Sequence, residues 1–475
     1  MKEIQELIEI SRFYGRDNRF VIAGGGNTSY KNKDKIWVKA SGSALATITE
    51  EGFAILDRTK LNPMSEKEYS KDSVEREDQV KNDLAVATLT KGKRPSVETS
   101  MHNVIDYPFV VHLHPTVVNG LLCSVNAESE LKRLFGEKVL FVEYTDPGYV
   151  LFKKVSDKLK GFRLLYNEEP KVIWLQNHGI FVAADSIDEI KSIYSDIFEK
   201  LEQSLKEQLP SGEIDISKRI VDIIPAIRMM LSHNGLKTLR VRNNKLIQYF
   251  SDNEVNRKDI IKPFTPDAIV YCKSNYLFIN GKDTAEILAE SEKVIDEFAD
   301  NYGYLPKVLL IKGVGLVAVG DNAGQCDIIL DVFEDAMNVA YISKSFGGPH
   351  PMSSEQIDFI DTWEVENYRR SVAAGNSAGR AENKTIVITG AAQGFGEGIG
   401  RCLILEGANV VIADLNEEKG SSTAECFKNL SKSNSSIFVK TDVSNIDSLE
   451  NLMYETVCRF GGIDCFISNA GVLRA

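Results

Sequence analysis

The chain has 475 residues, and 43% of them are hydrophobic, which is enough for two or three domains with cores of their own. Its formal net charge of -12 argues against binding to nucleic acid or to an anionic membrane, since both require a basic face. The seven cysteines are odd in number and form no CxxC motif, and the first residues are acidic where a signal peptide would be basic. We therefore expect a cytoplasmic protein with reduced thiols and no membrane segment.

The N-terminal region predicts a helix and then two strands that lead into turns of small residues. Apolar residues in 2–14 recur at helical spacing, as in a helix that covers one side of a sheet. A strand at 21–22 is expected to run into the glycines and the GNTS turn at 24–29, where free backbone N–H groups can bind an anion. A glycine-rich hairpin explains the same pattern equally well. A second strand, 36–38, precedes Ser41 and Gly42, and 66–93 predicts a charged connection with a polar strand.

The segment 95–115 contains an acid, Glu98, followed by His112 and His114. Residues 109–113 are β-branched or aromatic and predict a strand, in which alternate side chains leave on the same face, so the two histidines point together. His178 follows a further predicted strand, 172–175. Three neutral imidazoles around one divalent ion leave a position open for water or substrate, as in catalytic zinc sites. Core histidines that bond only to backbone remain the alternative.

The rest of this region predicts a short helix at 98–105, with Glu98 near its start, and a long amphipathic helix at 186–205. We place the boundary of a first domain, 1–212, at the small-residue turn that follows.

Parts of the middle region, 213–373, are similar in sequence to parts of the first domain. Residues 306–321 align without gaps on 170–185 and place Val314 opposite His178. Residues 266–272 can be laid on 108–114, which places Val270 and Cys272 opposite the other two histidines. We predict a degenerate second copy without metal ligands, with chance similarity as the alternative. A helix at 363–372 and a linker at 374–383 are expected to follow.

From residue 384 to 475 the pattern is strand, glycine turn, helix, strand. The second strand ends at Asp414, and an acid in that place hydrogen-bonds a ribose 2′-hydroxyl and repels a 2′-phosphate, which favours NAD over NADP. The predicted cofactor-binding residues are Gly390, Gly394, Gly396, Asp414, Asp442 and Asn469.

Residues 2–209 resemble the class II aldolase/adducin family. The resemblance rests on five motifs: GNTS at 26–29, Ser41-Gly42, PSxE at 95–98, HLH at 112–114 and NHG at 177–179. It implies an α/β/α domain in a homo-oligomer, with zinc on His112, His114 and His178 and with Glu98 as the catalytic acid/base. It also implies a substrate phosphate held by Asn27, Ser41, Gly42 and Ser96. Val97 departs from those family aldolases that have a second phosphate-binding serine there.

Residues 385–475 resemble the short-chain dehydrogenase/reductase family through TGxxxGxG at 389–396, Asp414, Asp442-Val443 and the NAG motif at 469–471. In that family the catalytic serine and a Tyr-x-x-x-Lys pair follow NAG, and no such pair occurs here after residue 384. We therefore expect the first half of a doubly wound Rossmann domain, with an incomplete NAD site, in a fragment of a longer polypeptide. The order of parts resembles bifunctional rhamnulose-1-phosphate aldolase/short-chain dehydrogenases.

These resemblances imply a zinc-dependent aldolase that cleaves a ketose 1-phosphate, L-rhamnulose 1-phosphate, to dihydroxyacetone phosphate and L-lactaldehyde. A sugar-phosphate 4-epimerase on the same metal site is the first alternative, although related epimerases carry aspartate in place of Glu98. The second is a non-catalytic adducin-like interaction domain, which the three histidines disfavour. The third is a dehydrogenase with a merely structural N-terminal region.

Overall fold

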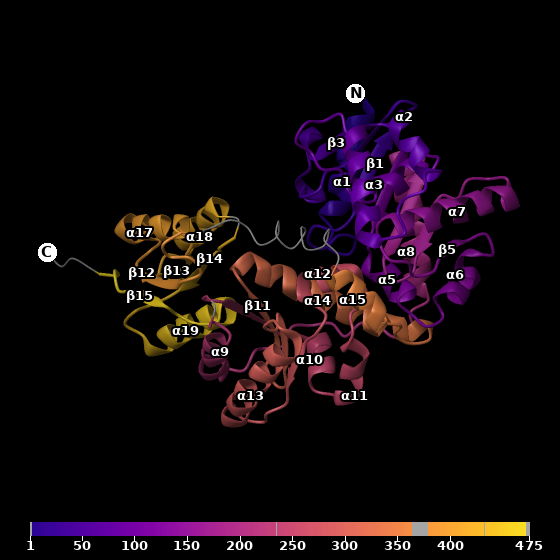
Figure 1. The fold of residues 1–475 in the computed structure, drawn as a ribbon. Helices are drawn as coiled ribbons and strands as arrows, with labels where there is room; N and C mark the ends of the chain where they lie inside the picture. The colour runs from indigo at the N-terminus through magenta and orange to yellow at the C-terminus, as the bar shows by residue number, and fades with distance from the viewer. Residues whose placement is uncertain (1, 234, 363–378, 432, 472–475) are drawn as a thin grey trace. The chain divides into compact units, whose positions relative to one another are not determined.

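The computed structural model describes residues 2–233, 235–362, 379–431 and 433–471. The chain divides into two units (Figure 1). The first consists of Met1–Leu209, Lys262–Asp267 and Asn338–Trp363, and the second of Pro210–Ile261, Ala268–Met337 and Glu364–Ala475. The predicted helix at 363–372 and residues 374–378 of the predicted linker lie outside the described residues. Within the described part of the chain, no helix is both long enough and apolar enough to cross a membrane.

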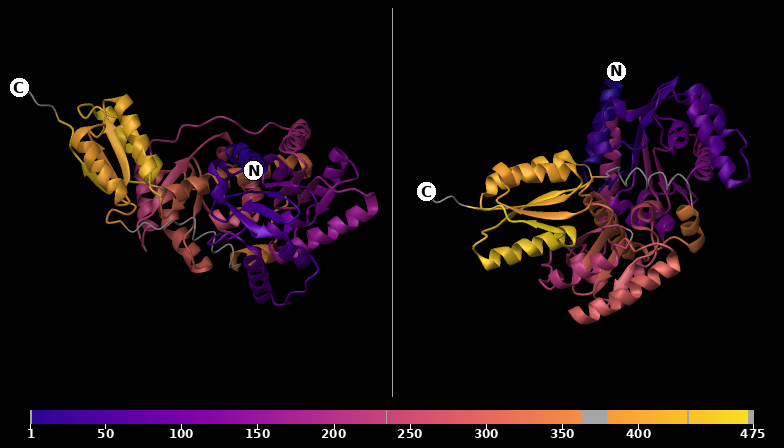
Figure 2. Two further views of the ribbon diagram at one scale, coloured as in Figure 1. Left: turned by 90° about the horizontal axis from the view of Figure 1, so that it is seen from above. Right: turned by 60° about the vertical axis from the view of Figure 1, so that its left-hand side comes forward.

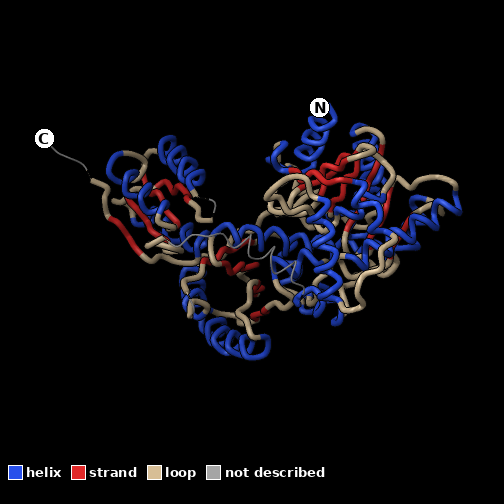
Figure 3. Tube along the Cα trace, turned by 45° about the horizontal axis from the view of Figure 1, so that its top comes forward, coloured by secondary structure: helices blue, strands red, loops and turns tan. Residues whose placement is uncertain are grey.

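A seven-stranded sheet in the order β3-β2-β1-β4-β7-β6-β5 forms the centre of the first unit, and Figure 3 shows its strands among helices. All neighbouring strands are antiparallel except β5 and β6. The strands are β1 (Asn27–Lys31), β2 (Lys35–Lys39), β3 (Phe53–Asp57), β4 (Phe109–Leu113), β5 (Leu140–Val142), β6 (Val172–Leu175) and β7 (Gly179–Ala184). The helices are α1 (Lys2–Gly15), α2 (Arg58–Leu61), α3 (Ser73–Ala87), α4 (Thr99–Val104), α5 (Thr116–Leu122), α6 (Ala127–Phe135), α7 (Tyr149–Tyr166) and α8 (Ile187–Gln203).

The two faces of this sheet bury different cores because successive strand side chains alternate. Phe109, Val111 and Leu113 of β4 pack into the core that contains the buried residues of α1 and α8. Val110 of the same strand packs into the opposite core, which contains Met101 of α4 and the apolar residues of α7. The unit is therefore the predicted α/β/α sandwich, with helices on both faces of the sheet.

Two local predictions in this unit are wrong. The strand expected before the glycines does not form, because the glycines make a turn and the strand β1 begins after them at Asn27. The charged segment 66–93 contains the helix α3 rather than a polar strand. Its buried residues, Val80, Leu84 and Ala87, are three and four positions apart, which is the spacing of a narrow helical stripe.

The second unit contains a four-stranded sheet in the order β8-β11-β10-β9. It repeats the arrangement β4-β7-β6-β5 of the first unit, with two antiparallel pairs followed by one parallel pair. Its strands are β8 (Thr238–Arg242), β9 (Leu277–Ile279), β10 (Val308–Ile311) and β11 (Gly315–Gly320). The helices within this unit are α9 (Ile220–Met230), α10 (Lys245–Ser251), α11 (Glu254–Arg257) and α13 (Thr284–Tyr302). Helices α12 (Pro266–Cys272) and α14 (Ala323–Ser343) contribute residues to both units, and α15 (Ser354–Thr362) belongs to the first.

The predicted degenerate second copy is confirmed as an architecture, but part of its alignment is wrong. Val270 and Cys272 lie in helix α12 and cannot be strand counterparts of the two histidines. The register pairs Leu113 with Ile180 in the first sheet and Arg242 with Leu316 in the second. The counterparts of His112 and His114 are therefore Val241 and Asn243, while Val314 remains the counterpart of His178.

The C-terminal part of the second unit is a parallel sheet in the order β14-β13-β12-β15, with helices on both faces (Figure 2). Its strands are β12 (Thr385–Thr389), β13 (Asn409–Asp414), β14 (Ser436–Lys440) and β15 (Cys465–Ile467), and its helices are α17 (Gly394–Leu405), α18 (Glu417–Leu430) and α19 (Ile446–Phe460). Parallel strands joined by helices are the predicted Rossmann pattern.

An ion pair between a buried arginine and a partly exposed aspartate joins this parallel sheet to the strand β8 and the helix α9. The Arg228 guanidinium, 2% exposed, donates to both carboxylate oxygens of Asp464 at 3.0 and 2.7 Å. It also donates to the carbonyl oxygen of Lys237 at 2.6 Å, just before β8. The carboxylate in turn accepts from the backbone N–H of Thr385 at 2.7 Å, at the start of β12. One buried guanidinium thus connects the two sheets.

We expect Arg228→Ala to destabilise the second unit by about 1–3 kcal/mol, because it removes the buried hydrogen bond to the Lys237 carbonyl oxygen and the link to Asp464. Hydrogen-deuterium exchange of peptides that cover β8 and β12 would show the loss as faster exchange in both. Arg380→Ala, which removes an exposed ion pair with Glu406 at 3.4 Å, is the control and should change exchange little. Equal effects of the two substitutions would contradict the assignment.

Candidate metal centre

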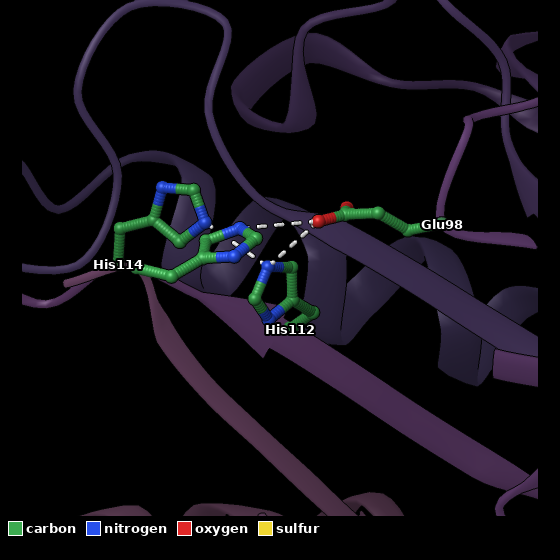
Figure 4. Close-up of side chains that lie close together, drawn as sticks. Glu98, His112 and His114 are labelled. Carbon is green, nitrogen blue, oxygen red and sulfur yellow. Dashed lines mark hydrogen bonds and ion pairs between the residues drawn. The ribbon is translucent and has the colours of Figure 1, made fainter. Parts of the chain in front are cut away.

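Three imidazoles and one carboxylate converge at the end of β4, as Figure 4 shows for Glu98, His112 and His114. His112 is the fourth residue of β4, His114 follows the strand, and His178 precedes β7. The Nε2 atoms of His112 and His114 are 3.0 Å apart. The Oε1 atom of Glu98 lies 3.1 Å from Nε2 of His112 and 3.3 Å from Nε2 of His178. The possible ligand atoms of the four residues all lie within 4.8 Å of one another.

The outer hydrogen bonds of two rings fix which nitrogen atoms face the centre. Nδ1 of His112 is 3.0 Å from the carbonyl oxygen of Ile180, and that oxygen can only accept, so Nδ1 carries the proton. Nδ1 of His114 is 2.7 Å from the Asp267 carboxylate and likewise donates. In the neutral rings both Nε2 atoms therefore present lone pairs to each other and to Glu98. Acceptors that face one another at these distances repel unless a cation lies between them or a ring takes up a second proton.

The donor set fits a divalent ion that prefers nitrogen and oxygen ligands. Zinc binds imidazole nitrogen at about 2.0–2.1 Å in tetrahedral geometry, which separates neighbouring ligand atoms by roughly 3.3 Å. The separations of 3.0, 3.1 and 3.3 Å are close to that value. His112, His114 and His178 would hold the ion, and Glu98 lies where a fourth ligand, or a base beside an open position, would be.

Glu98 is held at the N-cap of α4 and faces the three rings. The side-chain amide of Asn27 donates to its Oε2 atom, and its backbone N–H donates to the Ser96 hydroxyl at 3.2 Å. Burial raises the pKa of Glu98, but the positive charge and the hydrogen bonds that His112 and His178 supply when their rings are protonated outweigh burial and bring the pKa well below its usual value. Glu98 is therefore a carboxylate, oriented by Asn27.

His102, one turn along α4 from Glu98, is a buried core residue and lies outside the group that could hold an ion. Its Nδ1 atom is 2.8 Å from the Ser29 hydroxyl, and its backbone carbonyl accepts from the buried Lys31 ammonium at 2.8 Å. Burial lowers the pKa of His102 to about 3 and that of Lys31 to about 7. The alternative considered for the histidines, a core residue that binds no metal, therefore applies to His102.

The residues expected to bind phosphate lie together beside Glu98. The bridge between Ala40 and Pro95 brings Ser41 next to Ser96, and the Ser41 hydroxyl donates to the carbonyl oxygen of Pro95 at 3.4 Å. Gly42 has a φ of +85°, which a turn of this kind requires. Continuing the register of β1 and β2, in which Ser29 is opposite Val38, places Asn27 opposite Ala40.

A cation in this region escaped the sequence reasoning. Lys39 at the end of β2 is 6% exposed, and its ammonium donates to the carbonyl oxygen of Gly24 at 3.1 Å, in the glycine turn. Its position two residues before Ser41, a predicted phosphate-binding residue, could have identified it as a nearby positive charge.

The predicted nucleotide-binding residues are brought together at the carboxyl ends of the parallel strands, with one exception. Asp414 accepts from the backbone N–H of Ala392 in the glycine turn at 3.0 Å. Asn469 donates to the carbonyl oxygens of Thr389 and Gly390 at 3.0 and 3.1 Å, which joins the NAG segment to the same turn. A Cβ at Gly396 would lie 2.4 Å from the Gly390 oxygen, so only glycine fits there. Gly394 has a φ of +67°.

Asp442 is the exception, because its side chain forms hydrogen bonds within its own turn and not with the glycine turn. Its carboxylate accepts from the backbone N–H and the hydroxyl of Ser444 at 2.9 and 2.6 Å, and these bonds lower its pKa.

Comparison with protein-family models divides the chain in three. Residues 5–208 match the class II aldolase and adducin N-terminal domain, 218–369 match the second domain of class II aldolases, and 384–475 match short chain dehydrogenases. The chain therefore combines class II aldolase domains with a short-chain dehydrogenase domain. Class II aldolase and short-chain dehydrogenase domains together indicate an enzyme.

Among curated proteins, the oxidoreductase YuxG of Bacillus subtilis, which is described as uncharacterized, is 24% identical over 512 residues, covering 99% of this chain and 73% of YuxG. L-fucose dehydrogenase of Oryctolagus cuniculus is 37% identical over 95 residues, covering 20% of this chain and 31% of the relative. The chain thus spans most of the first relative but about a third of the second.

Two solved structures resemble the N-terminal region. The N-terminal class II aldolase domain of a Thermoplasma acidophilum protein has 25% identity and a TM-score of 0.37, with 42% of this chain and 92% of that chain covered. An L-fuculose 1-phosphate aldolase has 18% identity and a TM-score of 0.30, with 42% and 83% covered.

The repeated fold offers a matched pair of substitutions that tests the metal centre. A Cβ at Gly179 would lie 2.5 Å from Cδ2 of His114, whereas a Cβ at the corresponding Gly315 would lie 2.5 Å from the carbonyl oxygen of Arg242. Both alanine variants should lower the unfolding temperature, because each crowds a packed strand end. We expect only Gly179→Ala to weaken zinc binding, measured by competition with a chromophoric chelator. Native affinity in Gly179→Ala, or lost affinity in Gly315→Ala, would contradict the site.

Proposed function

We propose that the chain is a zinc-dependent aldolase that cleaves a ketose 1-phosphate, L-rhamnulose 1-phosphate, to dihydroxyacetone phosphate and L-lactaldehyde. The observation that carries the proposal is the convergence of three imidazole Nε2 atoms on one point beside the ionised Glu98 carboxylate. Such a set suits a reaction in which negative charge develops on substrate oxygen while a nearby base moves a proton.

In the proposed cleavage the bond between C3 and C4 of the sugar breaks. The C4 hydroxyl gives up its proton and becomes the aldehyde, while C3 takes up a proton and becomes the terminal carbon of dihydroxyacetone phosphate. Glu98 shuttles this proton, and Asn27 holds the carboxylate in place through its Oε2 atom. A divalent ion held by His112, His114 and His178 supplies Lewis acidity toward the sugar oxygens when it is bound.

The substrate phosphate is proposed to bind among Asn27, Ser41, Gly42 and Ser96, with Lys39 as the nearby cation. The Ser41 and Ser96 segments lie side by side, and Lys39 is anchored to the glycine turn by its bond to Gly24. Fixing the phosphate there orients the sugar, and orientation of this kind contributes much of an enzyme's rate enhancement.

In a full-length form, the dehydrogenase domain is proposed to use NAD on the aldehyde product, with Asp414 as the residue that selects against a 2′-phosphate. A homo-oligomer is proposed by resemblance to the aldolase family. The cysteines form no CxxC motif, which suits a reducing compartment, and the cytoplasmic location remains a prediction.

We expect Glu98→Gln to reduce kcat for release of dihydroxyacetone phosphate by about 10²–10⁴-fold, because the amide cannot accept the proton. The amide has nearly the same size as the carboxylate, so zinc held by the three histidines should be retained. Glu137→Gln, at an exposed glutamate of the same unit, is the matched control and should leave the rate unchanged. The assay compares rhamnulose, fuculose and ribulose phosphates, with and without chelator.

The outcomes separate the alternatives. Zinc binding with interconversion of C4 epimers and no aldehyde release would indicate the 4-epimerase. A chain that binds no zinc would favour the adducin-like interaction domain. Chelator-insensitive release of dihydroxyacetone phosphate, or full activity in Glu98→Gln, would overturn the proposed mechanism.

A further inference from the structure

The Asp267 carboxylate contacts one of the metal-binding histidines from a distant part of the sequence. Its Oδ2 atom lies 2.7 Å from Nδ1 of His114, across 153 positions of sequence. Both side chains are largely shielded from solvent, with His114 18% and Asp267 19% exposed. A short hydrogen bond between a ring N–H and a carboxylate in such surroundings belongs to the stronger, charge-assisted kind.

This contact determines the tautomer of His114. Because the carboxylate accepts the Nδ1 proton, the lone pair of Nε2 is directed toward His112 and the centre of the site. His112 obtains the same orientation from a backbone group, the carbonyl oxygen of Ile180 in β7. His114 follows β4 instead of lying within it, so its ring orientation depends on a side-chain partner.

The segment that carries Asp267 is fixed to the turn that carries His178. The side-chain amide of Asn177 donates to the carbonyl oxygen of Phe264 at 2.9 Å and to that of His350 at 2.8 Å. Asn177 itself has a φ of +53°, so the turn before His178 is tightly specified. Phe264, Asp267 and His350 all belong to segments of the first unit that lie in the range matched by the aldolase second-domain model.

We propose that Asp267 is a positioning residue of the metal centre, and that the segment matched as the second domain thereby completes a site whose ligands all come from the N-terminal domain. This inference rests on the metal-dependent function proposed above. A carboxylate behind a metal-binding imidazole fixes the ring and makes its free nitrogen a better ligand, and removing such a partner typically costs 10–100-fold in metal affinity.

The test measures the zinc dissociation constant by chelator competition, independently of any substrate. Asp267→Asn keeps the shape and a carbonyl acceptor but removes the charge, and we expect affinity about 10-fold weaker. Asp267→Ala removes both the acceptor and the charge, and the loss should approach about 100-fold. Asp188→Asn is the control, because this acid of the same unit is 90% exposed and touches none of the ligands.

The outcomes distinguish this inference from the proposed function. If the native chain binds no zinc, the proposed metal site itself fails. If the native chain binds zinc and Asp267→Asn and Asp267→Ala both bind it as tightly, the positioning role is overturned while the metal site stands. Circular dichroism of the metal-free variants separates lost folding from lost affinity, and the near-isosteric asparagine variant keeps the test decisive if the alanine variant unfolds. Recovery of affinity in Asp267→Glu would support the role of the carboxylate.

Discussion

The central feature of the aldolase region is the close approach of hydrogen-bond acceptors that repel one another. They are the imidazole nitrogens and the Glu98 carboxylate. Two imidazole lone pairs at 3.0 Å and a carboxylate oxygen at 3.1 and 3.3 Å are costly to hold in a partly buried place without positive charge. The fold nevertheless fixes them there from several directions: β4 carries His112, the turn before β7 carries His178, and the N-cap of α4 carries Glu98. A bound divalent cation would turn this repulsion into attraction, so the arrangement is one that could hold a metal ion.

The second copy of the fold shows what remains when that constraint is removed. It has the same strand order and strand directions as the first copy. It also has a glycine, Gly315, at the start of β11, where a Cβ would collide with the backbone of Arg242 at the end of β8. It has Val241, Asn243 and Val314 at the three ligand positions, and two of these are apolar. The features that the two copies share therefore belong to the backbone fold, and those that differ are the side chains of the candidate metal group. The second copy has contacts of its own, such as the Arg228 ion pair that joins it to the parallel sheet.

Sequence reasoning succeeded where the determinants are local. Alternation along 109–113 correctly placed His112 and His114 together, and the glycine turn between a strand and a helix correctly indicated the Rossmann pattern. It failed at 266–272, where a short apolar stretch fits a strand and a buried helix equally well. It failed also at 66–93, where few apolar residues made the helical stripe hard to see. Asp267 could not be found by motif spacing, because its contact with His114 spans 153 positions and depends on tertiary structure.

Zinc K-edge X-ray absorption of the purified chain measures the central claim most directly. The account predicts a first shell of nitrogen and oxygen atoms at about 2.0–2.1 Å, with outer-shell scattering from three imidazole rings. A shell containing sulfur at about 2.3 Å, or scattering from fewer than three rings, would contradict it.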